Sequence, residues 1–192
     1  MTKLRVLFIC THNSARSQMA EALLRSLAGD RFEVASAGIQ KTSIHPLAIR
    51  VMSEVSIDTS GHASKALDAV LGQPWDYVIT VCDDAKEKCP AFPERTRRRH
   101  WRVVDPSLVS GPEDEKLADF RWARDELREL LREWLADQQQ PPRGVGLFPL
   151  VVLLLIGSAA SAVAWWALGW ASGVITAIVV AIAAFAWFLW RA

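Results

Sequence analysis

The chain has no charged residue from Gly144 to Trp190, and this absence is the most prominent feature of its composition. At 1.5 Å per residue, these roughly 47 helical positions would cross the ~30 Å apolar core of a bilayer twice. No polar face remains to meet water, which argues against a hairpin of soluble helices. We therefore predict two membrane-spanning helices, near Leu147 to Leu168 and Val174 to Trp190, with Gly169 to Gly173 as the turn.

The predicted spans also lack an internal charge, so we interpret the hairpin as an anchor or partner-binding pair rather than a transport path. Tryptophans lie near both predicted interfaces, as aromatic belts do. We expect a multi-pass protein of the cell inner membrane, with two spans and the rest of the chain in the cytoplasm. The expected domains are residues 1–137, a Gln- and Pro-rich linker at 138–144, and the lipid-embedded hairpin at 145–192.

Cysteine and net charge are scarce as well. Three cysteines are an odd number, and the apolar run Val6 to Cys10 is too short for a secretory signal, which argues against a secreted disulfide scaffold. Arg191 is the only charged residue beyond Arg143, so residues 1–143 hold 21 acidic and 21 basic residues. That balance leaves no excess of positive charge, which argues against a nucleic-acid-binding protein. Because the four histidines are scattered, we predict no metal site. In a cytosolic domain the cysteines stay reduced, so we expect them to take part in the chemistry.

Apolar runs alternate with segments of helical spacing, which predicts an α/β fold with a four-stranded parallel sheet flanked by helices. The predicted strands are Leu4 to Ile9, Phe32 to Ala35, Tyr77 to Val81 and Trp101 to Val104, and the predicted helices are Ser17 to Leu27, Pro46 to Glu54, Ser64 to Leu71 and Glu113 to Ala136. Cys10, Cys82 and Asp105 each follow a predicted strand. Ligands of such sheets bind outside the carboxyl ends of the strands, so we expect these three side chains to converge.

The segment Cys10 to Ser17 joins the first predicted strand to the first predicted helix. Unpaired N–H groups and the helix dipole favour an anion at such a junction, and they equally favour a thiolate. We expect Cys10 to attack the centre of a tetrahedral oxyanion while Arg16 holds two of its oxygens. The remaining residues of this oxyanion-binding loop are Thr11, His12, Asn13, Ser14, Ala15 and Ser17, of which Asn13 suits a positive φ and Ser17 can donate to the sulfur.

A second informative segment runs from Cys82 to Cys89 and is followed by Pro90. A helix here would separate the two cysteines by about 10.5 Å along its axis, whereas a disulfide requires Cα atoms within roughly 7 Å. The pair can therefore bond only if the helix opens, which makes the segment a candidate redox switch. Together with Cys10 it can form a relay: Cys82 attacks the oxyanion-bound Cys10 to give a disulfide, and Cys89 then attacks Cys82 and frees Cys10.

Asp105-Pro106 also follows a predicted strand, and Asp105 can protonate a departing oxygen. The Arg-rich segment Glu94 to His100 is most simply a solvated loop, with docking of a reductase or anionic lipid as the alternative.

The chain closely resembles the thioredoxin-coupled arsenate reductases of the low-molecular-weight phosphatase superfamily. The resemblance covers about Leu4 to Ala136 and rests on Cys10 through Glu21, Ser36 to Gly38, the Cys82 and Cys89 pair, and His100-Trp101 followed by Asp105-Pro106. It implies that Cys10 attacks arsenate cradled by Arg16 while Asp105 acts as the acid. It further implies that Cys82 displaces arsenite and that Cys89 leaves a disulfide for thioredoxin. We hypothesise that an arsenite efflux protein is a partner of the hairpin.

Two departures from this family pattern affect the expectations. Ala15 stands where related phosphatases commonly carry a second cysteine, so no disulfide can form within the loop. Some reductases of this kind bind potassium, and Asn13, Glu21 and Ser36 match that pattern, but Lys65 replaces an expected acid. We therefore expect no tightly bound cofactor, and we hypothesise that the Lys65 ammonium takes the place of the potassium ion.

Two other functions use the same loop. A low-molecular-weight tyrosine phosphatase would hydrolyse phosphomonoesters through a phosphocysteine without Cys82 and Cys89, although Ser107 replaces the Tyr usual after its Asp-Pro pair. A noncatalytic oxyanion-binding module is disfavoured because Cys10, Arg16 and Asp105 are all present.

Overall fold

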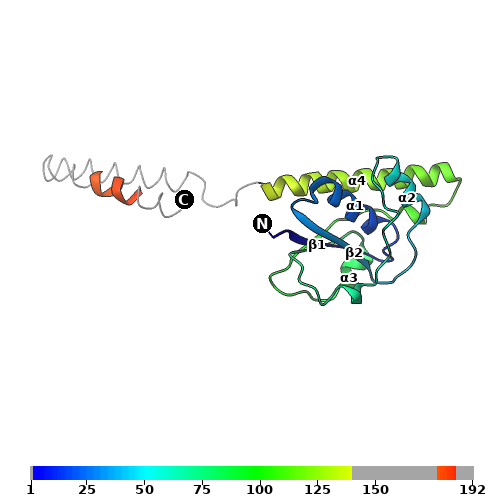
Figure 1. Cartoon of the computed structure of the whole chain (residues 1–192), viewed down its shortest axis with the longest axis horizontal. Coiled ribbons are helices and arrows are strands. Elements are labelled where there is room, and N and C mark those ends of the chain that lie inside the picture. The colour runs from blue at the N-terminus through cyan, green and yellow to red at the C-terminus, as the bar shows by residue number, and fades with distance from the viewer. Residues whose placement is uncertain (1, 140–176, 185–192) are drawn as a thin grey trace. The chain divides into compact units, whose positions relative to one another are not determined.

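Four parallel strands form the centre of the fold in the order β2-β1-β3-β4 (Figure 1). They are β1 (Leu4–Cys10), β2 (Phe32–Gly38), β3 (Tyr77–Thr80) and β4 (Arg97–His100). The structure is a computed structural model that describes residues 2–139 and 177–184, and it divides into units of residues 1–139 and 140–192. β1 lies between β2 and β3, and its residues Val6 to Cys10 are buried. A continuous apolar run suits a central parallel strand because both of its faces are covered.

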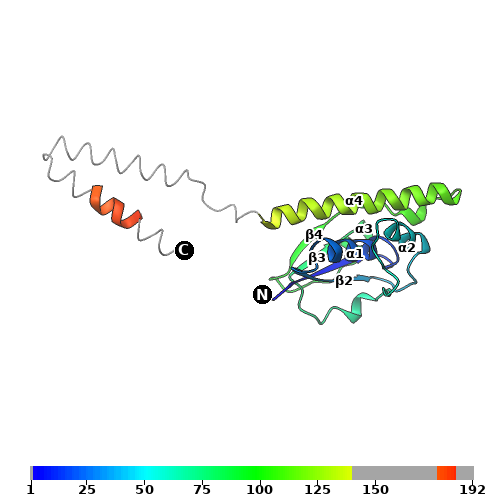
Figure 2. The ribbon, with the colours of Figure 1, turned by 45° about the horizontal axis from the view of Figure 1, so that its top comes forward.

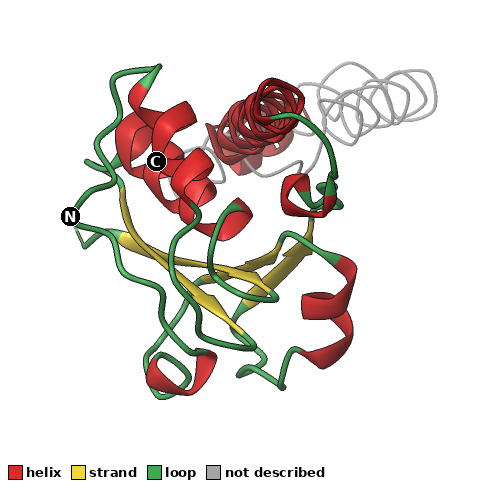
Figure 3. Ribbon diagram, turned by 90° about the vertical axis from the view of Figure 1, so that its right-hand side faces the viewer, coloured by secondary structure: helices red, strands yellow, loops and turns green. Residues whose placement is uncertain are grey.

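Helices cover both faces of this sheet (Figure 3). The α-helices are α1 (Arg16–Ala28), α2 (Pro46–Ser53), α3 (Asp83–Lys88) and α4 (Glu113–Gln139), and the short 3-10 helices are η1 (Leu67–Ala69) and η2 (Pro106–Leu108). α4 runs alongside α1 and α2 in both views of the ribbon (Figures 1 and 2). Its apolar stripe is buried, as its spacing predicts, and includes Leu117, Phe120, Leu127, Leu131 and Trp134. The predicted α/β fold with a four-stranded parallel sheet is confirmed.

The fourth strand is β4 (Arg97–His100), so its prediction at Trp101 to Val104 is wrong, as is the loop prediction for Arg97 to His100. β4 is an edge strand, where charged side chains are tolerated because one side remains unpaired. Two of its arginines also have partners: Arg97 donates to the Tyr77 hydroxyl at 2.6 Å, and Arg99 lies 3.0 Å from the Asp137 carboxylate. Of the apolar residues after it, Trp101 and Val103 pack in the core, whereas Val104 is exposed.

The predicted helix at Ser64 to Leu71 is also wrong, because only η1 forms there. The backbone of Lys65 has other partners: its N–H donates to Asn13 Oδ1 at 2.7 Å, and its carbonyl accepts from the Gly38 N–H at 2.9 Å. An extended segment can make these bonds to the neighbouring loop and strand, whereas a helix would use the same groups internally.

In the second unit, the structure describes only residues 177–184, which are helical and carry exposed apolar side chains at Ile178, Val179 and Ile182. Within the described parts of the chain, no helix is both long enough and apolar enough to span a bilayer. The predicted span at Leu147 to Leu168 lies outside the described residues, as do most of Val174 to Trp190 and residues 140–144 of the linker. The described structure therefore does not support the predicted hairpin.

Candidate active site

The predicted oxyanion loop begins at the carboxyl end of β1 and ends where α1 begins at Arg16. Cys10 is only 2% exposed, and its sulfur accepts a hydrogen bond from the Asn13 N–H at 3.1 Å. The Ser17 hydroxyl lies 2.9 Å from the same sulfur. Asn13 Nδ2 donates to that hydroxyl oxygen at 2.8 Å, so the Ser17 proton is free to point at the sulfur. Both contacts stabilise a negative charge on Cys10.

Asn13 fixes the shape of the loop. Its φ is +49°, in the left-handed region that asparagine tolerates, and its side chain is fully buried. The amide nitrogen also donates to Ser36 Oγ at 2.8 Å, while the amide oxygen accepts from the Gln18 side chain at 2.9 Å and from the Lys65 N–H. This one side chain therefore joins the loop to α1, to β2 and to the segment before η1.

The end of β2 approaches the loop so closely that only glycine fits at Gly38. A Cβ there would lie 2.7 Å from the Asn13 nitrogen and 2.8 Å from the His12 carbonyl carbon. Two backbone carbonyls of the loop also have partners outside it. The His12 carbonyl accepts from Thr42 Oγ1 at 3.1 Å, and the Ser14 carbonyl accepts from the His45 N–H at 2.9 Å. Ala15 is buried directly before α1.

Arg16 and Asp105 form an ion pair across the site, through Arg16 Nη2 and Asp105 Oδ2. Arg16 is 6% exposed, and its Nη1 donates to the Val103 carbonyl at 3.1 Å. The other oxygen of Asp105 accepts from the Ser107 N–H at 3.0 Å and from the Ser107 hydroxyl at 2.6 Å. The predicted anion-binding fork and the predicted acid thus lie together, and Ser107 orients the acid.

Cys82 lies beside the same loop, because β3 runs parallel to β1 with Thr80 opposite Ile9. Its sulfur is 3.3 Å from the hydroxyl of Thr11, the residue after Cys10. Cys82 is buried directly before α3, and Cys89 directly follows this helix. Cys10, Cys82 and Cys89 are all free thiols. Burial raises the pKa of the half-buried Cys89 thiol, and Arg98 partly offsets this effect.

A buried carboxylate lies behind the loop. Glu21 is 3% exposed, and its oxygens accept from Ser36 Oγ at 2.6 Å and from Arg25 Nη2 at 2.5 Å. Lys65 Nζ lies 3.6 Å from Glu21 Oε2. With two cationic side chains and a donating hydroxyl already directed at Glu21, this group does not have the donor set of a cation site. No cluster of three or more His, Cys, Asp or Glu residues suited to a metal occurs in residues 2–139 or 177–184.

Gln18 and His62 also belong to this environment, and no sequence pattern predicted their contact. Gln18 Oε1 accepts from His62 Nδ1 at 2.9 Å, and Arg25 Nη1 lies 3.2 Å from His62 Nε2. An arginine donor at Nε2 disfavours a second proton on the ring and so favours its neutral form. Burial likewise lowers the pKa of His62. His62 is 44 residues away from Gln18 in sequence, so only the fold brings them together.

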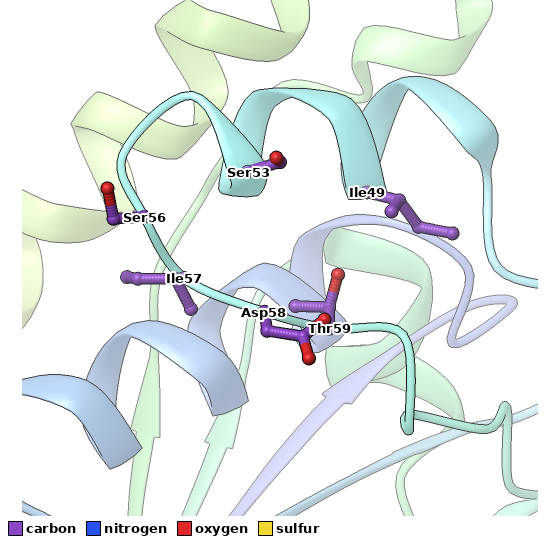
Figure 4. Close-up of a pocket in the computed structure, with 6 residues that line it drawn as sticks. All are labelled: Ile49, Ser53, Ser56, Ile57, Asp58 and Thr59. Carbon is purple, nitrogen blue, oxygen red and sulfur yellow. The ribbon is translucent and has the colours of Figure 1, made fainter.

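A surface pocket of about 340 Å³ lies between α2 and the segment that follows it (Figure 4). It is lined by Ile49, Ser53, Ser56, Ile57, Asp58 and Thr59. None of the predicted site residues lines this pocket. The candidate active site therefore lies elsewhere, at the carboxyl ends of the strands.

Together these features define an enzyme that uses a cysteine nucleophile on tetrahedral oxyanions: a strand-to-helix loop cradles the thiol, and the arginine at the start of the helix pairs with a carboxylate. Residues 5–141 match the family model described as low molecular weight phosphotyrosine protein phosphatase. The chain belongs to this family.

Several similar proteins are arsenate reductases. The arsenate reductase of Bacillus subtilis (strain 168) is 42% identical over 129 residues, which cover 67% of this chain and 93% of that protein. A solved structure described as an arsenate reductase in the oxidized state has a TM-score of 0.61 and 31% identity, covering 69% of this chain and 97% of that one. The thioredoxin-dependent arsenate reductase of Corynebacterium glutamicum has a TM-score of 0.50 and 34% identity, covering 68% and 62%.

Proposed function

We propose that this enzyme reduces arsenate to arsenite through a relay of Cys10, Cys82 and Cys89, and that thioredoxin restores the reduced thiols. One observation carries the proposal: Cys82 contacts the loop of the nucleophile through Thr11, and a third free thiol follows at the far end of the six-residue α3. Phosphate hydrolysis needs neither of these cysteines. Similarity to arsenate reductases over nearly their whole length supports the same assignment.

In the first step, the Cys10 thiolate attacks the arsenic of arsenate and forms a sulfur–arsenic bond. A hydroxyl of arsenate leaves with a proton from Asp105, as water. Arg16 holds the other oxygens, for which it must exchange its bond to Asp105 for bonds to the substrate. This exchange also frees the acid to meet the departing oxygen.

In the second step, the Cys82 thiolate attacks Cys10 Sγ. The electron pair of the sulfur–arsenic bond moves to arsenic, which leaves as arsenite, while Cys10 and Cys82 become a disulfide. The Cys89 thiolate then attacks Cys82 Sγ and releases Cys10 as a thiolate. The Cys82–Cys89 disulfide remains, and a dithiol such as that of thioredoxin reduces it.

One direct experiment tests this function. The chain is given arsenate with thioredoxin, thioredoxin reductase and NADPH, and separately an aryl phosphate without a reductant. We expect NADPH oxidation that depends on arsenate and yields one arsenite per NADPH. Rapid aryl-phosphate hydrolysis with no arsenite would contradict the proposal and favour the second candidate, a low-molecular-weight tyrosine phosphatase. That candidate rests on Cys10, Arg16 and Asp105, which suffice for phosphomonoester hydrolysis.

We further propose that the enzyme needs no potassium ion, because the Lys65 ammonium compensates the charge of Glu21. Exchanging sodium for potassium should leave arsenate turnover unchanged. The Lys65→Ala enzyme should lose part of this compensation and respond to potassium, whereas Lys41→Ala, which removes an exposed lysine, should not. Turnover that rises with potassium in the unaltered enzyme, together with no effect of Lys65→Ala, would overturn the idea.

The uncharged segment from Gly144 to Trp190 supports a further part of the proposal, a hairpin that holds the enzyme at the cytoplasmic face of the inner membrane. Release of arsenite there would place it near an efflux protein. Truncation after Gln139 preserves all of α4 and should spare arsenate turnover in solution. In cells that express both forms at the native level, the truncated enzyme should confer weaker arsenate resistance. Equal resistance of the two strains would count against the anchor.

A further inference from the structure

Two basic side chains, one at the end of β4 and one two residues beyond it, contact the first residue of α3. His100 Nε2 lies 3.0 Å from Asp83 Oδ1, and Arg102 Nε lies 3.2 Å from Asp83 Oδ2. The other ring nitrogen of His100 lies 2.9 Å from Thr80 Oγ1, at the end of β3. Both carboxylate oxygens of Asp83 are therefore engaged, and the group connects the start of α3 to two strands.

α3 depends on such contacts, because a helix of six residues is not stable alone in water. Ala85 is its only fully buried side chain, and Asp83 is the only α3 side chain that forms an ion pair within the described residues. Acidic residues in its first turn and lysines in its last turn add favourable interactions with the helix dipole.

The same helix keeps the second and third cysteines apart. Its six residues rise about 9 Å along the axis, whereas the Cα atoms of a disulfide lie within roughly 7 Å. Cys89 can therefore reach Cys82 only after α3 opens. Opening too early has a cost for the relay: a Cys82–Cys89 disulfide formed before arsenate reacts removes the thiol that must displace arsenite.

We propose that Asp83, His100 and Arg102 form a latch that keeps α3 closed and so sets the rate at which Cys89 attacks Cys82. The inference rests on the proposed relay and adds three positioning residues to it. The step concerned is attack of the Cys89 thiolate on Cys82 Sγ in the Cys10–Cys82 disulfide, with Cys10 leaving as a thiolate. The latch restrains this step without taking part in the preceding reaction at arsenic.

The test compares Asp83→Asn and Arg102→Gln in the full chain, with Asp84→Asn as the matched control. Asp84 has the same charge on the same short helix but no ion pair within the described residues. Reduced enzyme is mixed with one equivalent of arsenate and no reductant, then quenched with acid and alkylated. Peptide mass spectrometry separates the Cys10–Cys82 disulfide from the Cys82–Cys89 disulfide at each time point.

Both latch variants should convert the first disulfide to the second about two- to fivefold faster, the range expected for loss of an exposed ion pair. Arsenite should form at the unaltered rate, and Asp84→Asn, which loses only an interaction with the helix dipole, should accelerate the conversion less than Asp83→Asn. The two substitutions remove opposite charges, so an electrostatic effect on a thiolate would change the rate in opposite directions. Opposite changes, or no change in either variant, would overturn the latch.

A second measurement separates this inference from the proposed function. Oxidised glutathione, with no arsenate present, forms the Cys82–Cys89 disulfide from two thiols and releases two molecules of glutathione. This oxidation should also be about two- to fivefold faster in both latch variants, and amide hydrogens of α3 should exchange faster with deuterium. If the unaltered chain forms no arsenite, the proposed function fails. The latch is then judged by these two rates, and it fails if neither rises.

Discussion

The Cys89→Ser enzyme is expected to produce at most one arsenite per chain, however much thioredoxin is supplied. Cys10 and Cys82 can still complete the chemistry at arsenic, but no third thiol remains to release Cys10 from the disulfide. Multiple-turnover arsenate reduction should therefore stop after the first equivalent. The measurement is arsenite formed per chain as a function of time, with excess arsenate and the complete thioredoxin system.

Hydrolysis of an aryl phosphate provides the control, because it uses Cys10, Arg16 and Asp105 and should be nearly intact in the Cys89→Ser enzyme. Sustained arsenite production by this variant would refute the relay. In the unaltered enzyme, burial raises the pKa of Cys89, so less of it is thiolate at neutral pH. The step performed by Cys89 should therefore accelerate as pH rises.

The Asp105→Asn enzyme is expected to lose roughly 10² to 10⁴-fold in turnover of a phosphate ester with a poor leaving group, the usual contribution of a general acid. Asparagine keeps the shape of the side chain and can still accept from Ser107, but it has no proton to give to the departing oxygen. The structure supports this role because Asp105 lies against Arg16, the residue that we propose binds the oxyanion.

Leaving groups of different acidity distinguish loss of the acid from loss of structure. A nitrophenyl phosphate leaves readily without protonation, so the Asp105→Asn enzyme should retain much more activity on it than on phenyl phosphate. An equal loss on both esters would show that Asp105 acts through the structure of the site and not as the acid.

The oxyanion loop and most of the strands and helices could be predicted from the sequence, since both depend on local patterns. Cys10 to Ser17 carries a complete spacing motif, and the apolar run before it is a recognisable buried strand. Cys82 was expected near Cys10 because both follow parallel strands, and the register of Ile9 with Thr80 confirms that juxtaposition. Positive φ at Asn13 was likewise expected and is confirmed.

The location of the fourth strand could not be predicted in this way. Hydrophobic periodicity favours Trp101 to Val104, but these residues follow the strand, and only Trp101 and Val103 pack in the core, while the arginines of β4 occupy the sheet edge. Whether a charged segment is an edge strand or a loop depends on which neighbour it meets. That information is long-range and is not carried by the segment.

The sequence by itself determined the chemistry available to this protein: a thiol in an anion-binding loop, two further thiols and a strand-end carboxylate. These assignments depend on residue type and short spacing, which a sequence displays directly. Only the tertiary structure decided which charges compensate one another. Arg16 meets Asp105 across 89 residues, Lys65 meets Glu21, and Asp83 meets His100 and Arg102. Such pairs form because folding brings distant side chains within a few ångströms, where Coulombic attraction and hydrogen bonding become effective.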